Sequence, residues 1–333
     1  MNYMKYKHNI DDIIIHNELP SCLIGFLNYL EIIKGKSPNT IQAYKFDLVL
    51  FFRFLKIYKK MIPTDSNIEF NNIPIDDIDD DFMNKIKLTD LYAFLSFVEK
   101  YRNNSSYARS RKVASLKSFF KYLTNKAKII NENPALDLES PKISKRHPAY
   151  LNLEESKKLL NSIDGKYKER DFCIITIFLN CGLRISELCN INISDIRDDV
   201  LSVIGKGNKQ RTVYLNQACL SAINNYLIVR NKNLDKIIDK EALFISNKYT
   251  RISKRAVELM LKKHLLNAGL DIKKYTPHKL RHTAATLMYK HANVDIRSLQ
   301  QILGHENIST TQIYTHVDEE RLRNAIKANP LNE

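Results

Sequence analysis

The sequence predicts a mainly α protein with a small antiparallel β-sheet, folded as two domains. Its 333 residues are about twice the length of a typical domain. Only eight Gly and nine Pro interrupt the chain, and apolar residues recur every three or four positions along most of it, which is the spacing of helices that bury one face. The exception is 200–215, where two short β runs flank a turn that contains Gly, as in a β-hairpin.

The first half predicts four helices, over 19–33, from Ser37 to about residue 55, over 89–101 and over 105–125. The run Ser37-Pro38-Asn39-Thr40 is typical of a helix start, because it combines a polar cap with an early Pro. The last helix has one apolar and one basic face. The segment 63–81 is acidic and contains no basic residue, so we expect a solvated loop that does not contact DNA.

A basic segment between Pro141 and Pro148 disfavours helix and indicates a linker. We therefore expect an N-terminal helical domain over 15–140, a linker over 141–150 and a C-terminal domain over 151–333. The elements expected in the C-terminal domain are helices over 153–163, 170–181 and 185–190, strands over 200–204 and 211–215, and helices from 218 onward, interrupted at Thr276-Pro277 and near Gly304.

The composition is that of a soluble protein with an anionic partner. No stretch approaches the roughly 20 apolar residues of a membrane span, and the N-terminal segment lacks a signal-peptide pattern. The five cysteines form no C-x-x-C pair, which favours reduced core thiols in a cytoplasmic protein. The 52 Lys and Arg exceed the 37 Asp and Glu by 15. This excess favours a nucleic acid partner, although the codon bias of an AT-rich genome also enriches lysine.

Polar residues that could carry chemistry occur in four short segments. They are Gly182-Leu183-Arg184-Ile185-Ser186-Glu187-Leu188, the turn around Lys206, Thr276-Pro277-His278-Lys279-Leu280-Arg281-His282-Thr283, and Leu303-Gly304-His305 followed by Tyr314. Taken singly, each has a simple structural explanation. Arg184 could be a surface residue with a packed stem, and His278 and Arg281 could be a helix cap and a salt-bridge partner on one helical face.

In this order, the four segments resemble the tyrosine site-specific recombinases, most of all the bacterial Xer type. Two further runs extend the resemblance into the first half: Ser37-Pro38-Asn39-Thr40-Ile41-x-x-Tyr44-x-x-Asp47-Leu48, and Asn133-Pro134-Ala135 followed by Pro141-Lys142. The resemblance implies a helical, SAM-like core-binding domain and a mixed α/β tyrosine-recombinase catalytic domain that close on DNA as a C-shaped clamp. It also implies an enzyme that cuts and rejoins DNA through a 3′-phosphotyrosyl intermediate and a Holliday junction.

The resemblance assigns Tyr314 as the nucleophile, His278 as the base that accepts its proton, and Lys206 as the general acid that protonates the 5′ oxygen. A phenol with a pKa near ~10 needs such help at neutral pH. Lys209, in the same turn, is the alternative general acid. This chemistry needs neither a metal nor ATP, so no cofactor is expected.

Arg184, Arg281 and His305 are expected to stabilise the charge that grows on the phosphate, and Glu187 to orient Arg184. The planar guanidinium fork fits a phosphate better than an ammonium does. Further basic residues are expected to contact DNA: Arg109, Arg111, Lys112, Lys117, Lys209 and Arg211.

The resemblance implies as partners a double-stranded DNA recombination site and other recombinase subunits. These would form a homotetramer on two DNA sites or a heterotetramer with a second recombinase, with a DNA translocase as a possible further partner. The biological role would be chromosome-dimer resolution or integration and excision of a mobile element.

Three other interpretations remain. A type IB topoisomerase-like enzyme would use the same chemistry, and a non-catalytic DNA-binding regulator would have no need of all six polar positions. A zinc site would draw on four histidines, but no H-E-x-x-H motif or Cys pair supports it, so no metal is expected. Those histidines are His278, His282, His305 and His316.

Overall fold

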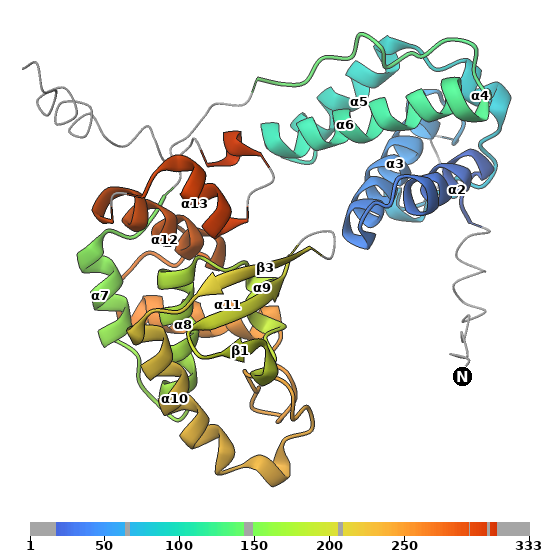
Figure 1. The fold of residues 1–333 in the computed structure, drawn as a ribbon. Coiled ribbons are helices and arrows are strands. Elements are labelled where there is room, and N and C mark those ends of the chain that lie inside the picture. Colours follow the sequence, from blue (N-terminus) through green and yellow to red (C-terminus); the bar gives the residue numbers. More distant parts are fainter. Residues whose placement is uncertain are drawn as a thin grey trace, which may run out of the picture. The chain divides into compact units, whose positions relative to one another are not determined.

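The computed structural model describes residues 18–63, 67–142, 149–205, 209–292, 294–304 and 307–311 (Figure 1). The chain divides between residues 145 and 146 into two compact units. Within the described ranges, no helix has both the length and the apolar character needed to cross a membrane. The fold is mainly helical with one small sheet, as the sequence predicts.

The first unit consists of the predicted helices and one short additional helix. They are α2 (Ser21–Asn28) with the π-helical turn Tyr29–Ile33, α3 (Pro38–Tyr58), α4 (Asp80–Asn84), α5 (Leu88–Lys100), and α6 (Ser106–Tyr122) with the π-helical turn Leu123–Ala127. The expected cap is present, since the Ser37 hydroxyl accepts a hydrogen bond from the backbone N–H of Thr40 at the start of α3. The short helix α4 was not predicted.

Buried phenylalanines form much of the core of the first unit. Fully buried side chains include Phe26, Phe51, Phe52, Phe94, Phe119 and Phe120. The rings of Phe51 and Phe94 meet edge to face, with centroids 5.1 Å apart, a geometry that adds to the stabilisation from buried area.

Asp47 on α3 is a buried carboxylate that α6 neutralises. The Nζ atom of Lys112 donates to Asp47 Oδ1 at 2.9 Å, and Arg111 pairs with the other carboxylate oxygen. Asp47 is 1% and Lys112 is 2% exposed. Lys112 therefore lies in the interior, and the basic face expected of this helix does not include it.

The acidic segment is solvated in part: its described carboxylate side chains are exposed, as expected, but three of its isoleucines are buried. It contains a 3-10 turn, Phe70–Asn72, and Asp79 caps α4 by accepting a hydrogen bond from Phe82 N. Its buried apolar residues are Ile73, Ile75 and Ile78. Burial of these three isoleucines removes apolar area from water and so stabilises the packing of the segment on the rest of the unit. One of those residues, Asp77, accepts a hydrogen bond from Lys56 Nζ at 2.7 Å.

The second unit surrounds its small sheet with helices. The helices are α7 (Leu153–Asn161), α8 (Lys168–Cys181), α9 (Ile185–Cys189), α10 (Gln217–Asn231), α11 (Lys254–Asn267), α12 (Pro277–His291) and α13 (Ile296–Leu303). The strands are β1 (Ile196–Arg197), β2 (Val200–Ile204) and β3 (Gln210–Tyr214), antiparallel in that order. The predicted hairpin is confirmed, with Val203 opposite Arg211, whereas β1 was not predicted.

The segment between α10 and α11 was expected to be helical, and this prediction is wrong for most of it. After the short 3-10 turn Leu234–Lys236, the chain forms isolated antiparallel bridges that pair Asn192 with Ala242 and Ile245 with Arg251. The Arg251 guanidinium also donates to the backbone carbonyl of Ile191 at 3.2 Å. Backbone pairing with a distant segment overrides the local helical pattern here.

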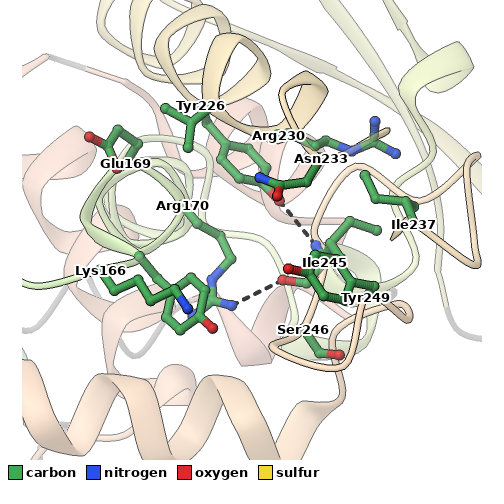
Figure 2. A pocket seen from close by; sticks show the side chains of 12 residues that line it. Lys166, Glu169, Arg170, Tyr226, Arg230, Asn233, Ile237, Ile245, Ser246 and Tyr249 are labelled. Atoms are coloured by element: carbon green, nitrogen blue, oxygen red, sulfur yellow. Dashed lines mark hydrogen bonds between the residues drawn. The ribbon is translucent and has the colours of Figure 1, made fainter. Parts of the chain in front are cut away.

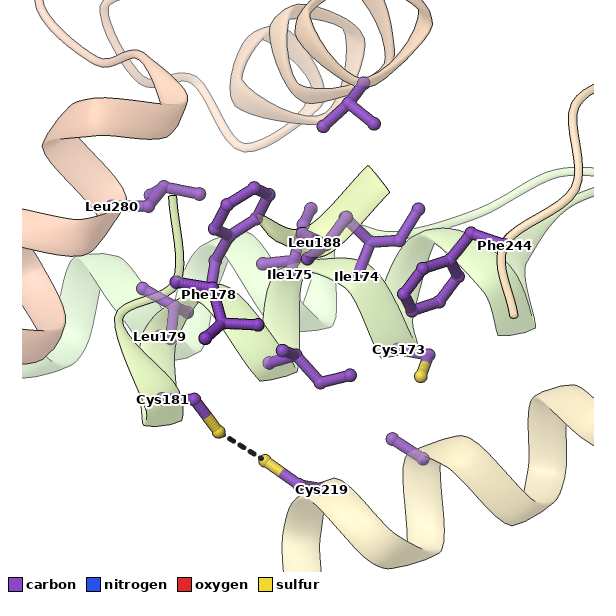
Figure 3. Packing of buried hydrophobic residues seen from close by; sticks show 14 of the residues in the cluster. Cys173, Ile174, Ile175, Phe178, Leu179, Cys181, Leu188, Cys219, Phe244 and Leu280 are labelled. Atoms are coloured by element: carbon purple, nitrogen blue, oxygen red, sulfur yellow. Dashed lines mark hydrogen bonds between the residues drawn. The ribbon is translucent and has the colours of Figure 1, made fainter. Parts of the chain in front are cut away.

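Helix α8 lies at the centre of the second core, and α10 and α12 both pack on it (Figure 3). The prediction that the cysteines are core thiols is confirmed, because all five are free and buried. Burial raises the pKa of the Cys22 thiol to about 12 and that of Cys189 to about 11. Across the α8–α10 contact, the Cys181 and Cys219 sulfurs are 3.8 Å apart.

Candidate active site

Glu187 on α9 is the buried centre of the candidate site. Its carboxylate accepts one hydrogen bond from the backbone N–H of Arg184 at 2.8 Å and another from Arg184 Nη1 at 2.7 Å. Both bonds are local, because Arg184 is the residue that precedes the first turn of α9. The expected role of Glu187 in orienting Arg184 thus has a direct geometric basis.

Two more arginines approach the same carboxylate from other elements. Arg211 on β3 donates from Nη2 to Glu187 Oε2 at 3.0 Å, and Arg281 Nη1 on α12 lies 3.9 Å from that oxygen. Burial alone would raise the pKa of Glu187. The Arg184 hydrogen bonds and the charges of Arg211 and Arg184 outweigh that effect, so its pKa lies below its ordinary value. We call Glu187 and these three arginines the Glu187 centre.

The same arginines bind the C-terminal end of α13. Arg211 Nη1 donates to the Ile302 carbonyl at 2.5 Å, Arg281 Nη2 to the Leu303 carbonyl at 2.5 Å, and Arg184 Nη2 to the Gly304 carbonyl at 2.9 Å. The last carbonyls of a helix have no partner within the helix and carry its partial negative charge. Three successive carbonyls, immediately before His305, are therefore paired with cations.

Two glycines make this close approach possible. Gly182 ends α8 and Gly304 ends α13, both in the left-handed conformation, with φ of 60° and 64°. The Gly182 carbonyl accepts a hydrogen bond from Arg281 Nη1 at 2.7 Å. A Cβ atom on Gly182 would lie 2.9 Å from Leu303 Cδ2, so a larger residue would separate α8 from α13.

His278 lies in the first turn of α12, whose start is capped by Thr276 and carries Pro277 at its first position. Its ring packs edge to face on His282, with centroids 4.5 Å apart. Partial burial and the positive charges of Arg281, Lys279 and Arg184 lower the pKa of His278. The imidazole is therefore mainly neutral at pH 7, which is the form that accepts a proton.

The turn end of the β2–β3 hairpin, at Gly205, lies beside the Glu187 centre. The Gly205 N–H donates to the Lys209 carbonyl at 2.8 Å and closes the turn. A Cβ atom on Gly205 would lie 3.5 Å from Glu187 Oε1 and 3.8 Å from Arg184 Nη1. Gly205 was not predicted to be a site residue. Lys206, His305 and Tyr314 lie outside the described residues.

The residues expected to contact DNA have different surroundings. Lys117 and Lys209 are exposed, Arg109 pairs with Glu99 at 2.5 Å, and Arg111 has a side chain that is 40% exposed beside Asp47. Lys112 is buried, and Arg211 belongs to the Glu187 centre with a side chain only 14% exposed. This position of Arg211 was not predicted, although Arg211 shares one face of β3 with the buried Val213, which the two-residue alternation of a strand indicates.

Within the described ranges, no group of three or more His, Cys, Asp or Glu side chains could bind a metal ion. Two of the four histidines of the zinc interpretation, His305 and His316, fall outside these ranges.

Comparison with known proteins identifies the class. Residues 149–321 match the phage integrase family, and residues 23–65 match the phage integrase N-terminal SAM-like domain. The chain belongs to the phage integrase family, the tyrosine recombinases, which are enzymes of site-specific DNA recombination.

Individual relatives are similar over most of the chain. It is 60% identical to tyrosine recombinase XerC of Caldanaerobacter subterraneus subsp. tengcongensis over 94% of this chain and 88% of the relative. It is 33% identical to tyrosine recombinase XerC of Thermodesulfovibrio yellowstonii over 93% and 97%. Among solved structures, XerH site-specific recombinase bound to palindromic difH substrate, in a post-cleavage complex, has a TM-score of 0.67 and 25% identity over 86% of this chain and 79% of that one.

Proposed function

We propose that Arg184 and Arg281 of the Glu187 centre bind the scissile phosphate of a DNA recombination site and that Tyr314 cuts the strand. The phenolic oxygen attacks phosphorus, a 3′-phosphotyrosyl bond forms, and the bond to the 5′ oxygen breaks. The observation that carries this proposal is that Arg184 and Arg281 converge on Glu187, close enough to His278 for both of their charges to lower its pKa. Because the covalent link conserves the phosphodiester, a new 5′ hydroxyl can reverse the reaction and complete strand exchange through a Holliday junction.

The arginines would supply electrostatic stabilisation of the transition state. Arg184 has a side chain that is 33% exposed, so it can bind a ligand while Glu187 and the Gly304 carbonyl fix its orientation. Arg281 is nearly buried and rigidly bonded. The Glu187 centre has three positive charges and one negative charge, and this excess favours a phosphate that gains charge during reaction. His305 would donate a third hydrogen bond.

Proton transfer would use His278 and a lysine of the hairpin turn. The lowered pKa of His278 supports its assignment as the base that accepts the Tyr314 proton. The general acid for the departing 5′ oxygen would be Lys206, with Lys209 as the alternative. Gly205, the residue before Lys206, lies next to Glu187, and this proximity supports the assignment of a lysine of the turn.

The assembly would be a tetramer on two DNA sites, either of this chain alone or with a second recombinase of the same family. Arg109, Arg111, Lys117 and Lys209 would contact the DNA backbone. The similarity to XerC recombinases favours chromosome-dimer resolution in the cytoplasm over mobile-element integration or excision, and a DNA translocase would then be a further partner.

The test is covalent capture on a nicked DNA substrate that carries the recombination site. The parent protein should become attached to DNA, and Tyr314→Phe should bind the site without forming an adduct. An adduct formed equally well by Tyr314→Phe would remove the nucleophile assignment. EDTA should leave capture unchanged, and loss of capture would favour the zinc interpretation. Recombination between two sites, compared with relaxation of a plasmid that lacks them, distinguishes a recombinase from a relaxing enzyme.

A further inference from the structure

We propose that Arg211 is a positioning residue for DNA cleavage, which fixes the β2–β3 hairpin on Glu187 and on the end of α13. This inference rests on the proposed function, because the purpose of the contact would be to place the general-acid lysine of the turn. It replaces the expectation that Arg211 contacts a DNA phosphate.

The contacts of Arg211 join three elements of the second unit. The residue belongs to β3, its Nη2 atom donates to Glu187 on α9 at 3.0 Å, and its Nη1 atom donates to the Ile302 carbonyl on α13 at 2.5 Å. Both terminal nitrogens thus have protein acceptors, and the side chain is 14% exposed. Of the three arginines of the Glu187 centre, Arg184 has the most exposed side chain, at 33%.

Because Arg211 is close to the turn in sequence, its contacts with α9 and α13 also restrain the residues that flank the turn. Arg211 pairs with Val203 across the hairpin and is two residues from Lys209, which is about 7 Å along a strand. The Lys209 carbonyl in turn accepts from Gly205 N at 2.8 Å. Without the hydrogen bond from Arg211 to Glu187, the turn end of the hairpin would lose a contact with α9. A displacement of the general acid by about 1 Å can lower the rate about 100-fold.

The experiment compares the full-length variants Arg211→Met and Arg211→Lys with the parent protein on a nicked recombination site. Three quantities are measured: affinity for the site as a function of salt concentration, single-turnover cleavage of ordinary DNA, and cleavage of DNA in which sulfur replaces the scissile 5′ oxygen. A thiolate departs without protonation because its pKa is far below that of an alkoxide. The sulfur substrate therefore bypasses the general acid.

We expect both variants to cleave ordinary DNA about 30- to 100-fold more slowly and the sulfur substrate within about three-fold of the parent. Affinity should change by less than about three-fold, with the same salt dependence. A direct phosphate contact would instead lower the slope of log affinity against log salt by about one, and that result would overturn the proposal. Equal losses on the oxygen and sulfur substrates would overturn it too.

Arg230→Met is the matched control for the loss of a buried arginine. Arg230 on α10 is 4% exposed and donates to the backbone carbonyls of Lys240 and Ala242 at 2.8 and 2.9 Å. It lines a pocket with Arg170 and Tyr226 (Figure 2), to which no residue of the Glu187 centre contributes. The folded fraction of Arg230→Met should cleave both substrates at the parent rate. If Arg230→Met instead cleaved only ordinary DNA more slowly, as the Arg211 variants are expected to do, a specific role for Arg211 would be contradicted.

Lys206→Ala and Lys209→Ala distinguish failure of this inference from failure of the proposed function. If neither lysine variant regains activity on the sulfur substrate, the general-acid assignment is wrong and the inference falls with it. If one lysine variant is rescued and the Arg211 variants are not, the proposed function stands and the positioning role of Arg211 is excluded.

Discussion

Arg211 occupies the space that a side chain at residue 304 would need. A Cβ atom on Gly304 would lie 2.6 Å from Arg211 Cδ and 2.8 Å from its Nε. Gly304 also has a φ of 64°, a conformation that L residues rarely adopt. The glycine is therefore required twice, by its own backbone and by the arginine that passes beside it.

Gly304→Ala is expected to lower the free energy of unfolding by about 1–3 kcal/mol through backbone strain and the contact with Arg211. It should also slow cleavage of a nicked site by about ten-fold or more, because the guanidinium must move from Glu187. Urea unfolding and single-turnover cleavage measure the two effects.

Gly269→Ala is the control for backbone strain alone. Gly269 has a φ of 63°, but its Cβ would meet only the end of the Lys158 side chain, at 3.7 Å. This variant should lose stability and cleave DNA normally once the folded fraction is taken into account. Identical cleavage rates for the two glycine variants would show that the Gly304–Arg211 contact is unimportant for activity.

Lys279→Gln is expected to move the acidic limb of the cleavage pH profile to higher pH. Lys279 is one of the charges that lower the pKa of His278. Its removal stabilises the imidazolium, so the base becomes protonated at a higher pH, by up to about half a unit. Single-turnover rates from pH 5 to 8 test this shift.

Lys273→Gln is the control, because it makes the same charge change at a residue that does not contribute to the lowered pKa of His278. Its pH profile should match that of the parent. An unshifted Lys279→Gln profile would argue against His278 as the base.

Glu187→Gln is expected to destabilise the second unit by about 3 kcal/mol at neutral pH, because the buried Arg281 and the partly buried Arg211 would lose the neutralising carboxylate. The folded-state pKa of Glu187 is lowered, so its ionised form contributes stability above its unfolded pKa and loses that contribution as pH falls through the folded pKa. The stability gap between parent and variant should therefore narrow in acid. Urea unfolding at a series of pH values measures it, with the exposed Glu154→Gln as the control. A gap that is independent of pH would contradict the ionic role.

Asp47→Ala is expected to cost about 3–5 kcal/mol, because Lys112 would be left as a buried, unpaired charge. Urea unfolding of the first-unit transition provides the measurement. The double variant Asp47→Leu with Lys112→Met removes both charges and should recover most of the loss. If the double variant were no more stable than Asp47→Ala, the cost would come from packing and not from the unpaired lysine.

Local signals predicted most of the secondary structure. The Ser37 cap, the three-and-four spacing of apolar residues and the Gly-containing turn depend on residues within a few positions of one another. The corresponding helices and the hairpin are present. The order of Arg184, Lys206, His278, Arg281, His305 and Tyr314 along the chain was sufficient to indicate the family.

Tertiary contacts decided where several charged and apolar side chains lie. Lys112 is buried because it pairs with Asp47, 65 residues earlier, and Ile73 is buried in a segment whose acidic composition suggested solvent. Arg184 reaches the carbonyl of Gly304, 120 residues away. Helix periodicity indicates which face of a segment is apolar, but it contains no information about which distant carboxylate or carbonyl will pair with a given cation. Only the folded chain therefore distinguishes an arginine available to a ligand from one whose side chain is bonded within the protein.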